Sequence, residues 1–309
     1  MILNILMLVL GFAMLVKGAD VFVDGAVSVA RRFHIPEMVI GLTIVAMGTS
    51  APEAAVSIAA ALKGSADITI GNVVGSNIMN ILVILGLSAV VAVLPVEKPT
   101  VYIEIPFVVA ISVFLLLMAN GGTVGRMEGV ILWALLIVYM IYLYKKARDH
   151  QTASEEEEKE NIALWKAILM ILGGIACIVI GSDIAVDGAT GIARALGLSD
   201  RFIGLTIVAF GTSLPELFTS VTAAFKGNTD IAIGNIVGSN IFNILFVVGT
   251  SALITPVEYT KSFYIDSLVA IGAVALLFLL CLPKKRLTRI SGLLMLACYG
   301  GYFVYLCML

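Results

Sequence analysis

The stretch GLTIVAMGTSAPEAAVSIAAALKGSADITIGNVVGSNIMNILVILGLS, residues 41–88, occurs a second time as GLTIVAFGTSLPELFTSVTAAFKGNTDIAIGNIVGSNIFNILFVVGTS, residues 204–251. A constant shift of 163 positions relates the copies, and 31 of their 48 positions are identical without a gap, which indicates an internal duplication. Weaker similarity extends upstream at the same shift, where Gly18, Asp20 and Asp24 correspond to Gly181, Asp183 and Asp187. We therefore expect a chain built from two equivalent halves.

The composition places both halves in a lipid bilayer. Of 309 residues, 60% are hydrophobic and only 13% are charged, and the mean hydropathy is +1.07, whereas soluble domains are about half apolar and about a quarter charged. A net charge of −2 offers no basic surface for nucleic acid. The four cysteines stand singly in apolar runs, without the spacing of a zinc site or a disulfide framework, so we expect them to be small core residues.

Ten apolar runs are long enough to cross the roughly 30 Å of bilayer hydrocarbon as helices. They lie near residues 2–30, 36–62, 68–93, 101–119, 127–145, 163–193, 199–225, 231–254, 262–282 and 288–308. The first run lacks the basic start of a secretory signal, so we interpret it as a retained helix. The expected fold is an all-α polytopic membrane protein with ten transmembrane helices.

Those helices divide into a five-helix repeat at 1–147, a polar linker at 148–162 and a second five-helix repeat at 163–309. Because five is odd, the second repeat enters the membrane from the opposite side, which makes the two repeats inverted. Inverted repeats are typical of transporters that work by alternating access. A symmetric receptor or enzyme scaffold has no general need for two oppositely oriented copies.

The positive-inside rule gives an orientation. Lys and Arg residues expected on the side of the two termini are Lys63, Arg126, Arg194, Arg201 and Lys261. Thirteen others fall on the side of the linker, and Lys17 lies inside the first run. We therefore expect an integral plasma membrane protein with a cytoplasmic linker and both termini outside.

Two carboxylates interrupt equivalent apolar runs: Glu53 within GTSAPE and Glu216 within GTSLPE. A charge near the bilayer centre costs roughly 2.5–3.5 kcal/mol on insertion scales, so an unpaired glutamate facing lipid is unfavourable. No Lys or Arg occupies the neighbouring apolar windows. A bound cation is the simplest remaining partner for the pair.

The residues around each glutamate supply further oxygen ligands. Pro52 and Pro215 lack the amide hydrogen that would bond the carbonyl four residues back, so each helix should kink and free a glycine carbonyl there. Hydroxyl residues three and four positions before each glutamate share its side of the helix. They are Thr49, Ser50, Thr212 and Ser213. Such hard oxygen ligands suit Ca2+ and Na+.

The third run of each half adds GNVVGSNIMN and GNIVGSNIFN. Ser76 with Asn80, and Ser239 with Asn243, stand at i and i+4 and are further candidate ligands. The remaining asparagines of these motifs, Asn72, Asn77, Asn235 and Asn240, are expected to be hydrogen bonders between helices. The aspartates Asp20, Asp24, Asp183 and Asp187 are expected to be solvated or capping residues near helix ends. The alternative for the whole set is helix packing around two protonated glutamates.

GTSxPE followed by GNxxGSNIxN, present twice, resembles the two alpha repeats of the Na+/Ca2+ exchangers and the wider cation/Ca2+ exchanger superfamily. The resemblance covers both repeat cores, 41–88 and 204–251, and agrees with ten helices along essentially the full chain. It implies a prokaryotic calcium/sodium antiporter in which Glu53 and Glu216 are shared by Ca2+ and Na+. Thr49, Ser50, Ser76 and their mates Thr212, Ser213 and Ser239 would add oxygens, Asn80 and Asn243 would orient the site or contact ions or water, and Ala46 and Ala209 would offer carbonyls to outer Na+ positions.

The resemblance leaves the coupling ion open within the superfamily. Some members carry Asp at the position of Asn243, and that position is associated with K+ dependence, so Asn243 weakens the case for K+ co-transport. Proton-coupled relatives use a different acidic motif. A cation channel is the alternative from another class. We expect no enzyme, no resident cofactor and no obligate protein partner; the expected partners are Ca2+, Na+ and the lipid bilayer.

Overall fold

The computed structural model describes residues 2–64, 67–151, 162–196, 209–260 and 262–308. The described part is all-helical apart from four two-residue strands. Its α-helices are α1 (Ile2–Arg32), α2 (Glu37–Ile40), α3 (Ala46–Thr49), α4 (Ala51–Leu62), α5 (Asp67–Met79), α6 (Gly86–Val91), α7 (Ile105–Met118), α8 (Arg126–Gln151), α9 (Leu164–Ala195), α11 (Ala209–Gly211), α12 (Leu214–Phe225), α13 (Thr229–Phe242), α14 (Gly249–Ile254), α15 (Ser262–Cys281) and α16 (Arg289–Met308). Four π-helical turns, each leading directly into an α-helix, lie at Gly41–Val45, Asn80–Leu85, Thr100–Glu104 and Asn243–Val248.

Within the described residues, eight continuous helical segments are long and apolar enough to cross a membrane, or up to nine if the bent pair Glu37–Thr49 and Ala51–Leu62 is one span. These segments coincide with nine of the ten apolar runs of the sequence. The remaining expected run, the seventh at 199–225, begins in residues outside the described part, and most of the expected linker also lies outside it. Helix α8 continues to Gln151, into the segment where the linker was expected to begin. The chain is therefore a multi-span membrane protein.

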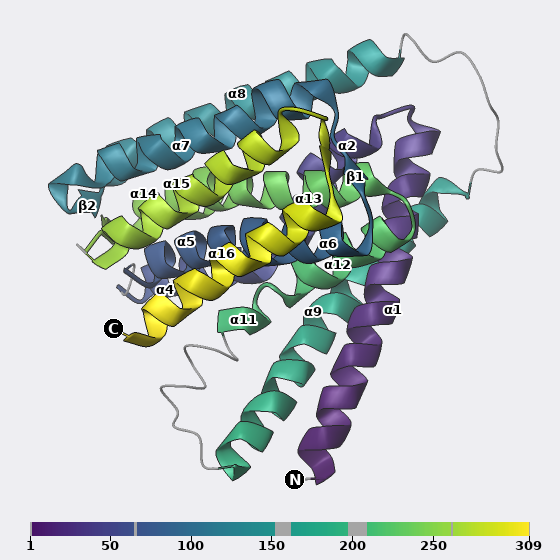
Figure 1. Cartoon of the computed structure of the whole chain (residues 1–309), viewed down its shortest axis with the longest axis horizontal. Coiled ribbons are helices and arrows are strands. Elements are labelled where there is room, and N and C mark those ends of the chain that lie inside the picture. The colour runs from purple at the N-terminus through teal and green to yellow at the C-terminus, as the bar shows by residue number, and fades with distance from the viewer. Residues whose placement is uncertain (1, 65–66, 152–161, 197–208, 261, 309) are drawn as a thin grey trace.

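Helices α1 and α9, of 31 and 32 residues, are the longest and lie side by side along one flank of the molecule (Figure 1). Their contact depends on glycines spaced by seven residues in α1, at positions 11, 18 and 25, and on the equivalent glycines of α9. A Cβ atom added at Gly181 would lie 2.7 Å from the Cβ of Met14. The two backbones therefore approach more closely than any larger residue allows, and the helices form one tightly packed pair.

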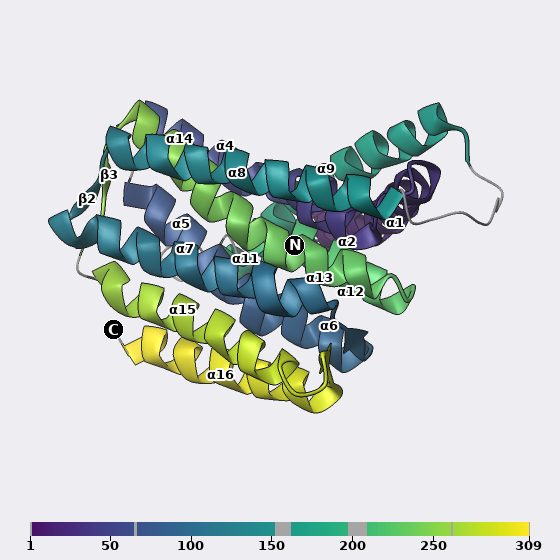
Figure 2. The same cartoon turned by 90° about the horizontal axis from the view of Figure 1, so that it is seen from above.

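The centre of the molecule is formed by the segments Ile68–Val91 and Thr229–Ile254, whose most apolar windows are 83% and 94% buried inside the protein. The corresponding windows of α7, α8, α15 and α16 are 17–39% buried. In Figure 2, α8 lies above the central segments and α15 and α16 lie below them, so the outer helices flank the central pair. The two GNxxGSNIxN motifs, at 71–80 and 234–243, thus occupy the most protected part of the fold.

Short antiparallel strands join the halves at two places. Strand β1 (Leu94–Pro95) pairs with β4 (Arg286–Leu287), and β2 (Thr123–Val124) pairs with β3 (Val257–Glu258). The 163-residue shift converts the register pair Leu94 and Leu287 into the pair Val257 and Val124. Each half therefore makes the same contact to the other half, residue for residue.

The expectation that all four cysteines are core residues was wrong for two of them. Cys281 is buried and Cys177 is half-buried, but Cys298 and Cys307 are exposed on α16. On an outer helix of a membrane protein, apolar residues point toward lipid as readily as toward protein. An apolar sequence context alone does not separate these two environments.

Candidate cation-binding site

The GTSxPE motif breaks its helix, as the proline predicted. Helix α4 begins with Ala51 and Pro52, and its axis is bent by 49° from the Glu37–Thr49 segment. Ser50, at the break, has φ −84° and ψ 8°, and Ser213 in the second half has almost the same values, −90° and 2°. The carbonyl of Gly211 that Pro215 leaves free accepts a hydrogen bond from the Ser182 hydroxyl of α9, at 2.8 Å.

Glu53 and Glu216 lie in the first turns of α4 and α12, and their side chains are 1% and 0% exposed. The Ser50 hydroxyl donates a 2.7 Å hydrogen bond to Oε1 of Glu216, so the break of the first half contacts the carboxylate of the second. The two carboxylates are also close enough for their charges to repel each other. Both stand at helix N-termini, where the helix dipole favours negative charge.

Two asparagines hold the glutamate helices in equivalent ways. Asn72 of α5 donates from Nδ2 to the backbone oxygen of Glu53 and to the Ser57 hydroxyl, at 3.1 and 2.9 Å. Asn235 of α13 makes the same two contacts in the second half, to Glu216 and Ser220, at 3.5 and 2.9 Å. The expected inter-helix role of Asn72 and Asn235 is confirmed. The two serines, one turn after each glutamate, were not singled out from the sequence, although both belong to the repeated motif.

The centre is rich in buried oxygen atoms that have no hydrogen-bond partner among the described residues. From the sequence-predicted set, these atoms are both carboxylate oxygens of Glu53, Oε2 of Glu216, the hydroxyls of Ser213 and Ser239, and the amide oxygens of Asn80 and Asn243. A buried polar group without a partner costs free energy, and native proteins rarely leave several of them together. The arrangement fits a bound cation that is coordinated by these oxygens.

A third intramembrane carboxylate, Glu104, shows what a structurally neutralised glutamate looks like here. Its side chain is fully buried, and its Oε1 accepts hydrogen bonds from Tyr142 and Lys146 of α8, at 2.8 and 2.9 Å. Sequence reasoning missed this ion pair, because a single sequence does not show that α8 packs against the turn that carries Glu104. No described lysine or arginine makes such a pair with Glu53 or Glu216.

The remaining predicted residues lie around the same break. Thr49 is buried, and the single proton of its hydroxyl lies within reach of two acceptors, Oδ1 of Asn235 at 3.0 Å and the carbonyl of Ala46 at 3.3 Å. That Ala46 carbonyl also accepts the backbone amide of Ser50, so one of its two lone pairs is available to an ion when Thr49 donates to Asn235. Thr212 is half-buried. Ala209 begins α11, and its side chain lies outside the described part.

Both Asn80 and Asn243 are the first residues of π-helical turns, and both are buried. Such turns disrupt the regular backbone ladder and occur frequently at functional sites. Ser76 and Ser239 are buried one helical turn earlier. Asn77 contacts α13 as expected for an inter-helix residue, whereas the Asn240 side chain donates to the carbonyl of Ile236 in its own helix, at 2.7 Å.

The aspartates of α1 are partly exposed, in agreement with a solvated role, but they do not cap a helix end. Asp20 and Asp24 lie within α1 and pair with Lys226, which follows α12. The mates in α9, Asp183 and Asp187, are exposed, in agreement with a solvated role.

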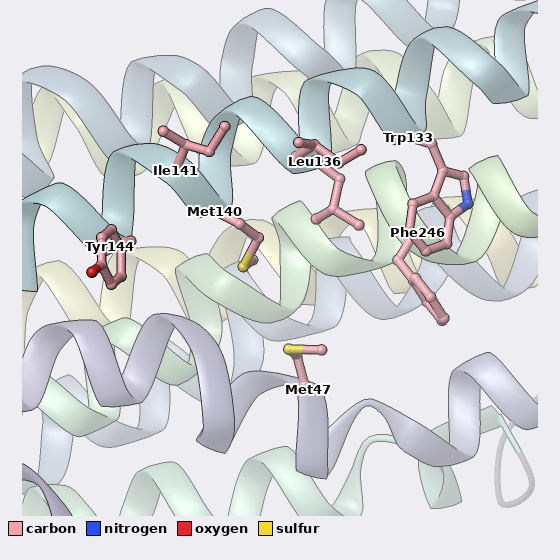
Figure 3. A pocket seen from close by; sticks show the side chains of 8 residues that line it. Met47, Trp133, Leu136, Met140, Ile141, Tyr144 and Phe246 are labelled. Carbon is pink, nitrogen blue, oxygen red and sulfur yellow. The ribbon is translucent and has the colours of Figure 1, made fainter.

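A groove of about 420 Å³ runs between α8 and the bent helix, and Figure 3 shows Met47 facing Met140, Leu136 and Phe246 across it. Its lining is almost entirely apolar. Ca2+ and Na+ require several oxygen ligands, so this groove is not a candidate ion site. Within the described residues, no cluster of three or more His, Cys, Asp or Glu side chains forms a metal site. An ion at the glutamate pair therefore depends on the hydroxyl, amide and backbone oxygens around it.

A family model described as sodium/calcium exchanger protein matches residues 3–145 and 166–308. The putative antiporter CaxA of Alkalimonas amylolytica is 38% identical over 98% of both chains. The sodium/calcium exchanger MaX1 of Methanosarcina acetivorans is 32% identical, again over 98% of both chains. The match thus spans both halves and reaches proteins with exchanger names.

Among solved structures, the sodium-calcium exchanger NCX_Mj soaked with 2.5 mM Na+ and 1 mM Sr2+ has a TM-score of 0.87 to this chain, with 34% identity over 98% of both chains. The same exchanger soaked with zero Na+ and Ca2+ gives 0.86 at 33% identity. The described helices therefore have the arrangement of a membrane exchanger.

Proposed function

Because the chain belongs to the sodium/calcium exchanger protein family, we propose that it is a secondary active antiporter that exchanges Na+ for Ca2+ by alternating access. The observation that carries this proposal is the buried pair Glu53 and Glu216, which no described basic residue neutralises. Hydroxyl and amide oxygens of the same repeated motifs are also buried without a protein partner among the described residues, and we propose that they complete the cation site. Ca2+ and Na+ are transported substrates here, and the proposal includes no resident cofactor.

The charge of the site explains how the movements of the two ions are coupled. Two ionised glutamates carry a total charge of −2. One Ca2+ neutralises this charge, whereas several Na+ together can exceed it. The two loads need the same oxygens, so they compete for the site. Either full load permits switching between the access states, and the empty, doubly negative site opposes it because burial of uncompensated charge is unfavourable. Exchange of one Ca2+ for more than two Na+ is electrogenic, and each net charge then contributes roughly 2.3 kcal/mol per 100 mV.

The proposed architecture is two inverted five-helix repeats, 1–147 and 163–309, with ten transmembrane helices and the intervening linker at 148–162. The repeat-related strand pairs and the equivalent contacts of Asn72 and Asn235 support a two-fold relation between the halves. In such an architecture, exchange of the roles of the two repeats converts one access state into the other. The long pair α1 and α9 slides over the core of α4, α5, α12 and α13 in this proposal.

The proposed location is the plasma membrane, with the linker in the cytoplasm and both termini outside, because the linker side has the excess of Lys and Arg. The proposed partners are the two ions and lipid, without an obligate protein partner. K+-dependent exchange is the second candidate. Sodium/potassium/calcium exchanger 2 of Rattus norvegicus is 35% identical over 50% of this chain, although the matched region is only 23% of that protein. Asn243 argues against K+ dependence, because Asp at this position is what is associated with K+ dependence in the superfamily.

Reconstituted vesicles test the proposal when Na+, K+ and H+ gradients are varied one at a time. Ca2+ uptake should require Na+ inside the vesicles and should rise when the interior is made positive, because exchange of one entering Ca2+ for more than two leaving Na+ carries net positive charge outward. Uptake that persists undiminished without a Na+ gradient would contradict the exchanger and favour a channel. Ca2+ uptake driven by K+ or H+ in place of Na+ would indicate the ion coupling of another branch of the superfamily.

A further inference from the structure

Three asparagines form a hydrogen-bond chain between the halves, and the turn that begins with Asn243 packs against α4, the helix of Glu53. Asn77 of α5 donates from Nδ2 to the backbone carbonyl of Asn240, at 3.4 Å. Asn243 donates from Nδ2 to Oδ1 of Asn77, at 3.1 Å. Oδ1 of Asn243 is buried and has no partner among the described residues.

The chain has only one possible polarity. A backbone carbonyl accepts hydrogen bonds and never donates them, so Asn77 must turn its NH2 group toward Asn240 and its oxygen toward Asn243. Asn243 must then turn its own NH2 group toward Asn77, and its oxygen is the atom left over. The equivalent chain is absent in the first half, where neither amide atom of Asn80 has a partner among the described residues.

We infer that Asn77 is a positioning residue that holds Asn243 with its amide oxygen, rather than its NH2 group, available to a transported cation. This inference rests on the proposed function. Cations take oxygen ligands, so an amide that rotates freely presents the wrong group part of the time and must be ordered when the ion binds. Asn80 lacks this restraint, which makes the two asparagines unequal despite their equivalent repeat positions.

A double-mutant cycle tests the role. Asn77→Leu is close in size, removes the restraint, and should raise the half-saturating concentration of Ca2+ or Na+ about tenfold, since one lost orienting hydrogen bond is of that order. The maximal exchange rate should change less. In an Asn243→Asp background the same substitution should have little effect, because the two oxygens of a carboxylate are equivalent and need no orientation. Asn240→Leu is the matched control, since it keeps the backbone carbonyl that Asn77 contacts and its side chain makes no hydrogen bond to Asn80 or Asn243 within the described residues.

Equal effects of Asn77→Leu in both backgrounds would assign Asn77 a purely structural role and overturn the inference. An unchanged half-saturation for both ions in the single variant would overturn it as well. Wild-type protein without Na+-dependent Ca2+ exchange would instead refute the proposed function, so the two failures are distinguishable. Should Asn77→Leu not fold, Asn77→Ser also removes the polarity-setting amide and gives the same comparison.

An ion pair connects α1 to Lys226, the residue that follows α12. Lys226 Nζ lies 2.6 Å from Oδ1 of Asp20 and 2.7 Å from Oδ1 of Asp24, and it also donates to the Asp20 backbone oxygen at 3.0 Å. Partial burial alone would lower the pKa of Lys226, but the hydrogen bonds to the two aspartates outweigh it and the pKa is raised. Lysine therefore keeps its charge in this contact.

The repeat supplies a second set of the same three residues. Lys63, Asp183 and Asp187 correspond to Lys226, Asp20 and Asp24 at the 163-residue shift, and all three are exposed. None of them forms an ion pair within the described residues. Helix packing differs between the halves in the same way as the ion pairs. Helix α1 packs along α12, whereas the equivalent helices α9 and α4 make no comparable contact in the described structure.

We propose that these two sets are alternating latches, with the Lys226 latch closed in the state seen here and the Lys63 latch closed in the opposite access state. This proposal also rests on the proposed function. Partly exposed ion pairs each contribute little, so the latches bias an equilibrium between states instead of locking it. With the proposed orientation, Lys226 lies at the cytoplasmic end, and the present state is closed to the cytoplasm.

Measurements of the half-saturating Ca2+ concentration at each membrane face test the latches. Lys226→Gln should change the ratio of half-saturating Ca2+ concentrations at the two membrane faces by about 2- to 10-fold. Lys63→Gln should change it in the opposite direction, the double variant should lie near wild type, and Lys226→Arg should preserve the ratio. Shifts in the same direction, or unchanged ratios in variants that still exchange ions, would overturn the proposal. Absence of exchange in wild-type vesicles would refute the proposed function instead.

Discussion

Glu53→Gln should make the ion-free protein more stable while it abolishes Ca2+ exchange. Both carboxylate oxygens of Glu53 lack a partner among the described residues, so the substitution removes a buried charge and breaks no hydrogen bond of that side chain. It also removes the repulsion between Glu53 and Glu216. An uncompensated charge at this depth costs roughly 2.5–3.5 kcal/mol on insertion scales, which sets the upper limit of the gain.

Glu216→Gln should gain less stability than Glu53→Gln. Oε1 of Glu216 accepts a 2.7 Å bond from Ser50. A hydrogen bond to a charged acceptor contributes about 1.5–3 kcal/mol, against about 1 kcal/mol for a neutral one. Weakening of this hydrogen bond therefore reduces the gain in stability by about 0.5–2 kcal/mol. The unfolding free energies of the two variants should differ by that amount.

Thermal unfolding in lipid nanodiscs at alkaline pH, with chelator or with added Ca2+, measures both effects. Wild type should be stabilised by Ca2+, by about 2.7 kcal/mol at a concentration one hundred times the dissociation constant. Neither glutamine variant should show that stabilisation or support Ca2+ flux. A Glu53→Gln protein that is less stable than wild type without ions, or that still gains stability from Ca2+, would refute the reasoning.

Three further outcomes are expected. Asn243→Asp should alter ion dependence, adding K+ or pH sensitivity to Ca2+ flux, and unchanged kinetics across K+ and pH would count against its placement near the ions. Gly181→Ala should destabilise the α1 and α9 pair by about 1–3 kcal/mol through overpacking, whereas Gly173→Ala should not, because nothing lies within 4 Å of a Cβ atom added there; equal unfolding temperatures for the two variants would argue against the close helix contact. Acidification should slow exchange by competition of protons with cations for the glutamate pair, and flux that increases on acidification would indicate proton coupling instead.

The duplicated sequence predicted most of what positions the site. Because Pro52 removes a helix hydrogen bond, the 49° break beside Glu53 could be inferred from local chemistry. Burial of Glu53 and Glu216 could be inferred from the cost of a charge that faces lipid. The repeat also predicted that Asn72 and Asn235 would have equivalent roles, since identical residues in equivalent contexts find equivalent partners.

Contacts between distant segments could not be predicted in this way. The bond from Ser50 to Glu216 and the pairing of Lys146 with Glu104 depend on which helices are neighbours, and periodicity within one helix contains no such information. The same holds for Cys298, because lipid and protein core favour the same apolar residues. The difference between Asn80 and Asn243 was hidden for another reason: equal positions in two repeats become unequal in any single access state.

Equilibrium binding of radioactive Ca2+ to the purified protein, with Na+ as competitor, tests the shared site most directly. We expect a single Ca2+ per chain, complete displacement by saturating Na+, and loss of binding in both Glu53→Gln and Glu216→Gln. Ca2+ that stays bound at saturating Na+, or that binds normally without either glutamate, would contradict a single site used in turn by the two ions.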